Sequence, residues 1–472
     1  MLLRPCLKSR VDGWVRFWHT LGRYLKTKKE RSSEMKTLKI IKKISDLVTV
    51  IPLAESESDF AVVSPNKIVF ALGASEKELG DLIKTEERNL PGVLSEHVLR
   101  GPYNSFPSAV TLLPTMDCNL RCEYCYARGG ESKSHMPFET VANTLDAVAD
   151  LNGTSELTLT FAGGGEPFLD FGVVEQSYNY AKRFFNKVSL RVITNGTFNE
   201  KEMEWLMENN VFTRISFDGV AHEKQRPFAD GSSSLETVQK NIVRLVKAGY
   251  PPVIQCVVTR ESISDMKRTL SYIADLGVEV IKVEPVHSSS ISRADDTLTI
   301  NPRKFAYELV EVVKYIVDEG LNLKLDTQFF SKPSAMPYCN ADGRNIVVTP
   351  KGDVSSCVEI TRKEDPYSFP FIYGQVISRG DRKEKFLINR KAVRKLSEFH
   401  FTNYSRCADC NLRLLCGGGC PIKNVWDNGF PLKPSNYVCQ IEHLLLPKLL
   451  SLIATNKKVR DVLIDQASIE CN

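Results

Sequence analysis

The feature that most constrains the fold is a regular alternation of short apolar and longer amphipathic segments that begins at Ser108. The apolar segments predict strands at Val110–Leu113, Leu157–Phe161, Leu190–Thr194, Thr213–Phe217, Val253–Val258 and Ile281–Glu284. The segments that follow them predict helices at about 138–151, 172–186, 199–209, 235–248, 264–276 and 302–319. Pro302 at a helix start, and Gly249 and Gly277 after helix ends, fit these boundaries. Six β-then-α units predict an α/β fold with a parallel sheet, either a partial barrel or an open sheet.

The composition is that of an ordinary globular protein and excludes several classes. The 472 residues are enough for two or three domains, and 42% are hydrophobic and 25% charged. The net charge is only +5, and much of the basic excess lies in residues 1–36, so nothing indicates nucleic-acid binding. No run of about 18 apolar residues occurs, and residues 1–25 lack the apolar core of a secretory signal. We therefore expect a cytoplasmic protein without a membrane span.

Residues 1–36 form a basic N-terminal extension that also carries aromatic residues such as Trp14 and Trp18. One interpretation is an amphipathic helix that binds a surface. The other is a poorly ordered extension, or a true start of the protein at Met35. Both interpretations stay open from the sequence.

Residues 37–104 predict a small α+β unit. Phe60–Val63 and Ile68–Ala71 are short apolar strands on either side of a turn signal. Ser75 is placed to cap a following helix, and Glu78, three residues later, completes a capping box.

The cysteines are distributed unevenly. Of 13 cysteines, ten fall into two groups, one near residue 120 and one between residues 339 and 439. A secreted disulfide-rich protein is usually small and cysteine-dense throughout, whereas clustered thiols in a cytoplasmic chain indicate metal binding. Cys6, Cys256 and Cys471 lie outside both groups, and we expect no metal role for them.

The first group is Cys118, Cys122 and Cys125, which share one loop directly after the first predicted strand. Four-iron clusters are held by cysteine thiolates and take four ligands, so three cysteines leave one iron open to chelate a small molecule. A tetrahedral zinc site is the alternative, but it needs a fourth ligand, and the nearby His135 has no supporting spacing. Three cysteines so close together on a polar loop do not fit a buried core.

The spacing C-x3-C-x2-C, with an aromatic residue before the last cysteine, resembles the radical S-adenosylmethionine (SAM) superfamily. The resemblance covers about residues 105–325 and implies a partial (β/α)6 barrel. It also implies that the open iron binds the amino and carboxyl groups of SAM and that Tyr124 lies against the adenine.

The ends of the other predicted strands carry matching residues. The second strand runs into Ala162–Pro167, where glycines permit close backbone approach and an acid can accept hydrogen bonds from an ammonium group. Taken alone, this segment is also compatible with a plain glycine-rich turn. The resemblance implies that SAM is contacted by Gly164, Gly165, Glu166, Ser216 and Arg226. His287, after the sixth strand, is either a catalytic residue or a polar residue with structural hydrogen bonds.

The second cysteine group lies in residues 326–445, which are rich in loops, and residues 446–472 predict a C-terminal helix and tail. Its pattern, C…G-x4-C…C-x2-C-x5-C-x3-C…C, is similar to the SPASM domain, which holds two auxiliary 4Fe–4S clusters; a zinc ribbon is the alternative. The resemblance implies that one cluster is held by Cys407, Cys410, Cys416 and Cys439. It assigns the other to Cys339, Cys357 and Cys420, with no fourth cysteine between Asn340 and Ser356.

The combined resemblance implies a peptide maturase. Such an enzyme cleaves SAM reductively to a 5′-deoxyadenosyl radical, which takes a hydrogen atom from a residue of a peptide or protein substrate. The electron would come from a donor such as ferredoxin or flavodoxin. Residues 37–104 occupy the position of a peptide-recognition domain, which would add an extended peptide to its sheet edge.

Two alternatives remain from the sequence. Anaerobic sulfatase maturases, which form formylglycine, have an Asp as general base directly after the G-x4-C cysteine. Here Val358 stands at that position, and Glu359 follows as a substitute base in a different register. A non-catalytic iron–sulfur or zinc protein is the second alternative, but it would not need a SAM-binding motif beside its cysteines.

Overall fold

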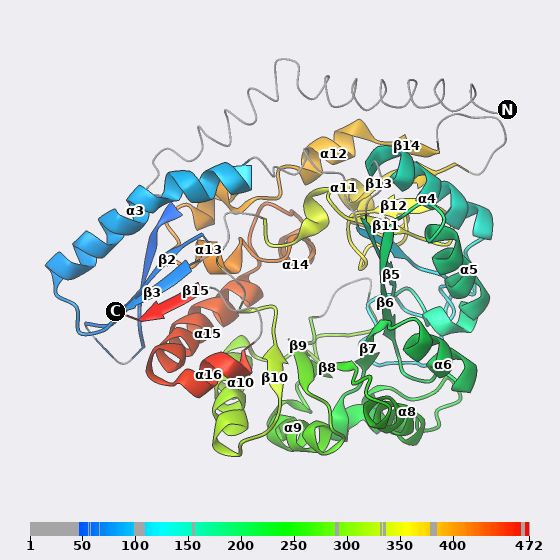
Figure 1. Cartoon of the computed structure of the whole chain (residues 1–472), viewed down its shortest axis with the longest axis horizontal. Coiled ribbons are helices and arrows are strands. Elements are labelled where there is room, and N and C mark those ends of the chain that lie inside the picture. Colours follow the sequence, from blue (N-terminus) through cyan, green and yellow to red (C-terminus); the bar gives the residue numbers. More distant parts are fainter. Residues whose placement is uncertain are drawn as a thin grey trace.

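We describe the protein from a computed structural model of the chain (Figure 1). The described residues are 47–463 and 468–471, with gaps at 55, 57, 66, 99–108, 153–155, 288–291, 331–332, 334–336 and 378–384. The predicted basic extension, residues 1–36, lies outside them, so its two interpretations stay open.

The centre of the molecule is a curved sheet whose parallel part contains all six strands predicted from the alternation (Figure 1). These strands are β4 Ala109–Leu112, β5 Glu156–Phe161, β6 Lys187–Thr194, β7 Phe212–Ser216, β8 Val253–Val258 and β9 Val280–Pro285. A seventh parallel strand, β10 Lys324–Asp326, pairs with β9. The prediction of a partial barrel is confirmed.

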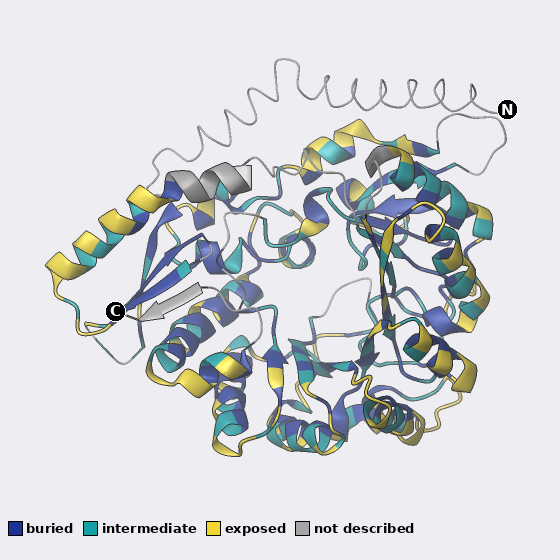
Figure 2. Ribbon diagram, in the orientation of Figure 1, coloured by how far each residue is buried: buried dark blue, intermediate teal, exposed yellow. Residues whose placement is uncertain are grey.

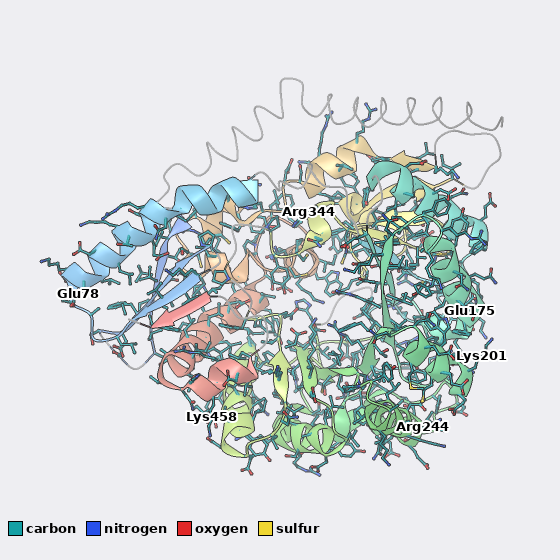
Figure 3. The ribbon with its side chains drawn as sticks, in the orientation of Figure 1. Glu78, Glu175, Lys201, Arg244, Arg344 and Lys458 are labelled. Carbon is teal, nitrogen blue, oxygen red and sulfur yellow. The ribbon has the colours of Figure 1, made fainter. Side chains whose placement is uncertain are left out.

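Helices cover the outer side of this sheet (Figure 1). They are α4 Phe138–Asn152, α5 Phe171–Ala181, α6 Glu200–Glu208, α8 Leu235–Lys247, α9 Met266–Asp275 and α10 Pro302–Asp318. Figure 2 shows their buried stripes toward the sheet and their exposed stripes toward solvent. Charged side chains such as Glu175, Lys201 and Arg244 lie on this outer surface (Figure 3). Apolar burial under the helices therefore holds the layers together.

The two faces of the strands differ in chemistry. On β8 and β9, Ile254, Cys256 and Val283 are buried beneath the helices. The alternate positions, which face the inner side, include the polar residues Gln255 and Lys282 and are half-buried. Because side chains alternate along a strand, this pattern gives the barrel an apolar outer face and a polar inner face.

The sheet continues into the C-terminal cysteine region. Strand β11 Ile346–Val348 pairs in parallel with β4, and three antiparallel strands follow it. These are β12 Asp353–Ser355, β13 Ile372–Val376 and β14 Phe386–Ile388. The sequence predicted no strands here, because segments of three to five residues are too short to show a period.

A second, smaller sheet contains the predicted N-terminal strands. It has the order β1 Thr49–Pro52, β2 Phe60–Ser64, β3 Lys67–Ala71 and β15 Ser468–Cys471. Helix α3 Glu76–Val98 begins with the predicted capping box, in which the Ser75 N–H donates to Glu78 at 2.9 Å and the Glu78 N–H donates to the Ser75 hydroxyl at 3.4 Å. Strand β15 runs parallel to β3, so the C-terminal end of the chain lies beside its N-terminal sheet (Figure 1).

Helix α15 Asn436–Thr455 crosses the lower part of the molecule and packs against α10 (Figure 1). It is the one helix within the described ranges that is long and apolar enough to span a membrane by length and composition. Its buried side, which includes Ile441, Leu445 and Leu449, is in the protein core, as expected for a core helix. The shorter helices are α7 His222–Gln225, α11 Ser368–Phe371, α12 Arg390–Leu396, α13 Arg413–Cys416, α14 Pro421–Asn428 and α16 Lys457–Val462.

Candidate functional site

The loop with the first three cysteines follows β4 at the carboxyl end of the parallel strands. Its backbone pairs with the segment after β7, where the Arg121 N–H donates to Pro227 at 2.8 Å and the Glu123 N–H donates to Gln225 at 3.1 Å. Ligands of parallel α/β sheets bind at this end of the strands. The structure thus places the cysteine loop where a cofactor would be expected.

The three thiols lie close enough to influence one another electrostatically. Burial, together with the charge of the nearby Glu166, raises the pKa of Cys118 to about 12. Burial also raises the pKa of Cys122 to about 11, although the Arg226 guanidinium opposes this shift. Thiolates in such surroundings need compensating positive charge, which iron supplies.

The donor set fits a cluster better than a single ion. Within the part of the chain that the structure describes, no three Cys, His, Asp or Glu side chains converge on one metal position. A four-iron cluster does not require such convergence, because each thiolate binds its own iron. Three cysteines on one half-buried loop therefore suit a cluster with one open iron.

The glycine-rich turn after β5 packs against the cysteine loop. The Gly165 N–H donates to Thr115 at 3.0 Å, and the Glu166 N–H donates to Asp117 at 2.8 Å. A Cβ atom on Gly165 would lie 1.9 Å from the Asp117 carbonyl oxygen, and Gly164 has a φ of +91°. Only glycine permits this approach, so the structure brings Gly164 and Gly165 together with the cysteines.

Glu166 is buried and fully engaged within the protein. Its carboxylate accepts hydrogen bonds from the Thr194 hydroxyl at 2.6 Å, the Asn195 N–H at 2.6 Å and the Phe168 N–H at 3.3 Å. Burial raises its pKa to about 7, although these hydrogen bonds lower it. The carboxylate ties the turn to the end of β6, and its contact with SAM stays a prediction.

Asp218, just after β7, is the centre of a buried network of hydrogen bonds within the protein. It accepts from Arg226 through Nε at 2.9 Å and Nη2 at 3.1 Å, and from the Val257 N–H at 2.9 Å. The Tyr124 hydroxyl also donates to it, and the Arg226 guanidinium lies 5.2 Å from the centre of the Tyr124 ring. Asp218 thus joins two of the predicted SAM-contacting residues, while Ser216 is half-buried at the strand end.

Glu359 lies in the C-terminal cysteine region, two residues after Cys357. It accepts from the Lys423 ammonium at 2.9 Å, and that ammonium sits 4.0 Å from the centre of the Trp426 ring. Tyr126, from the cysteine loop, is also near: burial raises its pKa, and the charge of Glu359 raises it further. The predicted base therefore faces the region between the cysteine loop and the C-terminal cysteines, held by a lysine that the sequence did not single out.

His287 occupies a different environment. Its Nε2 lies 3.1 Å from the Asp427 carboxylate, and its ring packs 5.5 Å from Trp426 and 5.3 Å from Tyr437. Its side chain is only 8% exposed. These contacts favour the structural interpretation of His287 over the catalytic one.

Four of the C-terminal cysteines surround one cavity of about 220 Å³. They are Cys407, Cys410, Cys416 and Cys439. This is the set that the resemblance assigned to one auxiliary cluster, and the cavity brings all four together.

The other three C-terminal cysteines, Cys339, Cys357 and Cys420, form a second set whose thiols influence one another. The glycines between Cys416 and Cys420 let the two sets approach. A Cβ atom on Gly417 would lie 2.9 Å from the Tyr338 Cα, and one on Gly418 would lie 2.6 Å from the Tyr404 ring. The two tyrosines, which no sequence pattern marked, thus pack between the sets. Cys256 is buried in β8, away from them.

Residues 112–273 match the sequence profile of the radical SAM superfamily. The chain carries a radical SAM domain. This domain covers β5 to β8 with the cysteine loop and the glycine-rich turn, so the resemblance to this superfamily is confirmed.

Three relatives illustrate the range of similar proteins. The uncharacterized protein MJ0907 of Methanocaldococcus jannaschii is 30% identical over 174 residues, which are 36% of this chain and 59% of that protein. The subtilosin biosynthesis protein AlbA of Bacillus subtilis is 26% identical, over 70% of this chain and 71% of AlbA. The cysteine-type anaerobic sulfatase-maturating enzyme of Clostridium novyi is 22% identical, over 64% of this chain and 85% of that enzyme. Relatives such as this sulfatase-maturating enzyme are named as enzymes, which confirms the prediction that the present chain is an enzyme.

Two solved structures share the fold. The structure of anSMEcpe with bound AdoMet and a peptide has a TM-score of 0.58 at 18% identity and covers 74% of this chain and 99% of that one. SuiB of Streptococcus suis bound to its precursor peptide SuiA has a TM-score of 0.54 at 16% identity, with 76% and 81% covered. At this identity the likeness concerns the fold alone.

Proposed function

We propose that the protein is a peptide maturase that cleaves SAM reductively and abstracts a hydrogen atom from a residue of its peptide substrate. The observation that carries the proposal is the packing of the three-cysteine loop against the Gly164–Glu166 turn at the carboxyl ends of the strands. A relative that takes part in bacteriocin biosynthesis and neighbours solved with peptides support the substrate class.

The residues of the chain would hold and orient the cofactors. Cys118, Cys122 and Cys125 would bind a 4Fe–4S cluster, which when bound supplies the electron for SAM cleavage and an iron for chelation. Ser216 is half-buried at the carboxyl end of β7, where its hydroxyl would meet a bound ligand. Arg226 places a positive charge beside Cys122 and would favour bound anionic groups.

The polar inner face of the barrel would hold the substrate residue. Glu284 accepts from Gln255 and Lys282, each at 2.8 Å, so charged and amide groups line the strands there. Glu359 would act as the base that accepts a proton from the substrate, and Lys423 keeps it in place. The two C-terminal cysteine sets would hold auxiliary 4Fe–4S clusters near this face.

A ferredoxin or flavodoxin would supply the electrons.

The peptide would first be captured by the sheet of β1 to β3. The edge of β3 is occupied by β15, whereas β1 is the outer strand on the other side. One β1 carbonyl, that of Val50, accepts a hydrogen bond from the Asn411 side chain at 3.3 Å. Capture by strand addition therefore has to use β1 or displace β15.

The test is SAM cleavage by the full chain after anaerobic reconstitution with iron and sulfide. We expect dithionite-dependent release of 5′-deoxyadenosine, measured by liquid chromatography and mass spectrometry. Cys122→Ala is expected to reduce release to background, because two cysteines hold the cluster poorly. The matched control is Cys256→Ala, which removes a thiol outside both cysteine groups and should retain activity. Full activity of Cys122→Ala, or no release by iron-loaded wild type, would contradict the proposal.

A further inference from the structure

The small sheet has two outer strands, β1 and β15, and the outer side of β1 is a poor acceptor for a further strand. The Val50 carbonyl points outward from β1, since it accepts a hydrogen bond from the Asn411 side chain at 3.3 Å. Pro52, two residues later, directs its backbone to the same side and has no N–H to donate. Both outward-facing residues of β1 are therefore compromised for strand addition.

Strand β3 has neither defect. Its residues, Lys67–Ala71, include no proline or glycine, so each carries an N–H that can enter a ladder. The side of β3 that faces away from β2 is filled by β15, whose Ser468–Cys471 pair in parallel with Lys67–Phe70 (Figure 1). The structure thus shows that this edge accepts an extended segment from a distant part of the chain.

Strand β15 is attached in a way that permits exchange. The chain before it is held in the core up to Leu463, which is 1% exposed and forms a bridge with Leu325. Strand β15 has four residues and pairs on one side alone. Its pairing with β3 is parallel, whereas β1–β2 and β2–β3 are antiparallel, and parallel pairing is slightly less stable per residue. Release of β15 would therefore leave α16 and the core in place.

We propose that β15 is an internal competitor for the edge of β3, and that an extended segment of the peptide substrate binds this edge by displacing it. This inference rests on the peptide substrate of the proposed function and adds the regulation of its docking site. A tethered segment competes at an effective concentration on the order of mM. A substrate segment therefore gains access only if it pairs with β3 better than β15 does.

The experiment compares peptide binding by the reconstituted full chain and by a variant that lacks residues 464–472. The probe is a synthetic peptide of residues 464–472, labelled with fluorescein at its N-terminus and carrying Cys471→Ser to prevent oxidation. Fluorescence anisotropy should show that the variant binds the probe and that the full chain binds it about tenfold more weakly, because the tethered strand competes.

A peptide of the same composition in scrambled order is the control and should bind neither protein. The inference is overturned if the variant does not bind the probe, if both proteins bind it equally, or if the scrambled peptide binds as well as the probe.

A second variant keeps the length of the chain. Adjacent N–H groups of a strand point to opposite sides, so one of the two at Ile469 and Glu470 faces β3. The double substitution Ile469→Pro, Glu470→Pro removes that donor and should strengthen probe binding as the deletion does. Probe binding that stays at the level of the unmodified chain would contradict the role of β15 as a competitor.

Hydrogen exchange locates the bound peptide. In the deletion variant, amides of Lys67–Phe70 should exchange faster than in the full chain, and saturating probe should restore their protection. Protection of Thr49–Pro52 instead would place the peptide on β1 and overturn the inference. Release of 5′-deoxyadenosine by the same preparations tests the proposed chemistry separately. Loss of probe binding with intact SAM cleavage would refute only the role of β15.

Discussion

His222 is a buried histidine whose neutral form is built into the loop after β7. Its Nδ1 accepts from the Asp218 N–H at 3.3 Å, and its Nε2 donates to the Ser234 hydroxyl at 3.0 Å, since that hydroxyl donates to the Arg226 carbonyl. Burial lowers its pKa to about 4, although Asp218 opposes this shift. A protonated ring would place a second N–H against the Asp218 N–H.

We therefore predict an acid-sensitive step in stability that depends on His222. Because its pKa is lower in the folded protein than in the unfolded chain, its contribution is complete above about pH 6.5 and is lost as the pH falls toward about 4. The loss is at most about 3 kcal/mol. Urea unfolding at several pH values should show a weaker acid dependence in His222→Gln. An acid dependence in His222→Gln equal to that of the parent would show that His222 does not contribute.

Sequence reasoning could name the cysteines and the glycine-rich turn, since each is a short motif with its own spacing. It could not find the Tyr124–Asp218 contact, because the two residues are 94 positions apart and no local pattern joins them. For the same reason no local pattern marks Glu442, which lines the four-cysteine cavity. Its place on the cavity wall follows only from how α15 packs.

At the scale of elements, the alternation predicted the barrel well because its strands and helices are long enough to show a period. The observed ends of all six strands lie within three residues of the predicted ends. Both ends of β8 are the predicted residues. Helix α5 ends at Ala181, five residues before the predicted end, because a turn at Lys182–Phe184 replaces its last helical turn. Strands of three residues, such as β11 and β12, depend on pairing with distant segments, which a single sequence does not display.

The glycine segment Gly417–Gly419 is the element that most constrains the C-terminal cysteine region, since all three residues have positive φ. We predict that Gly418→Ala destabilises the fold by about 2–4 kcal/mol, because the new Cβ meets the Tyr404 ring as well as adding backbone strain. The control is Gly429→Ala, which has a similar φ but no neighbour closer than 4.0 Å, and it should cost about 1–2 kcal/mol.

The measurement is denaturant unfolding together with the iron content after reconstitution. Gly418→Ala should also lose iron, because the segment connects Cys416 of one cysteine set to Cys420 of the other, whereas Gly429→Ala should not. Equal losses for the two variants would mean that contact with Tyr404 is unimportant.

At the scale of the whole molecule, the two ends of the described chain meet in one sheet. Strand β15 covers the edge of β3 along Lys67–Phe70. Unpaired strand edges promote pairing between molecules. We predict that deletion of residues 464–472 increases self-association relative to the full chain, measured by light scattering over a range of concentrations. Deletion of Asn472 alone leaves the paired residues in place and should change nothing. Identical behaviour of both deletions would show that this strand does not protect the edge.

The pairing of β11 with β4 has a consequence for protein engineering. Val110–Leu112 and Ile346–Val348 form a seam of backbone hydrogen bonds between the barrel and the region that carries the seven cysteines from Cys339 to Cys439. A chimaera that exchanges this region with that of another protein therefore cannot be cut at a flexible linker. The exchange has to transplant both halves of the seam as one block, or the first strand of the barrel, β4, loses one of its two neighbouring strands.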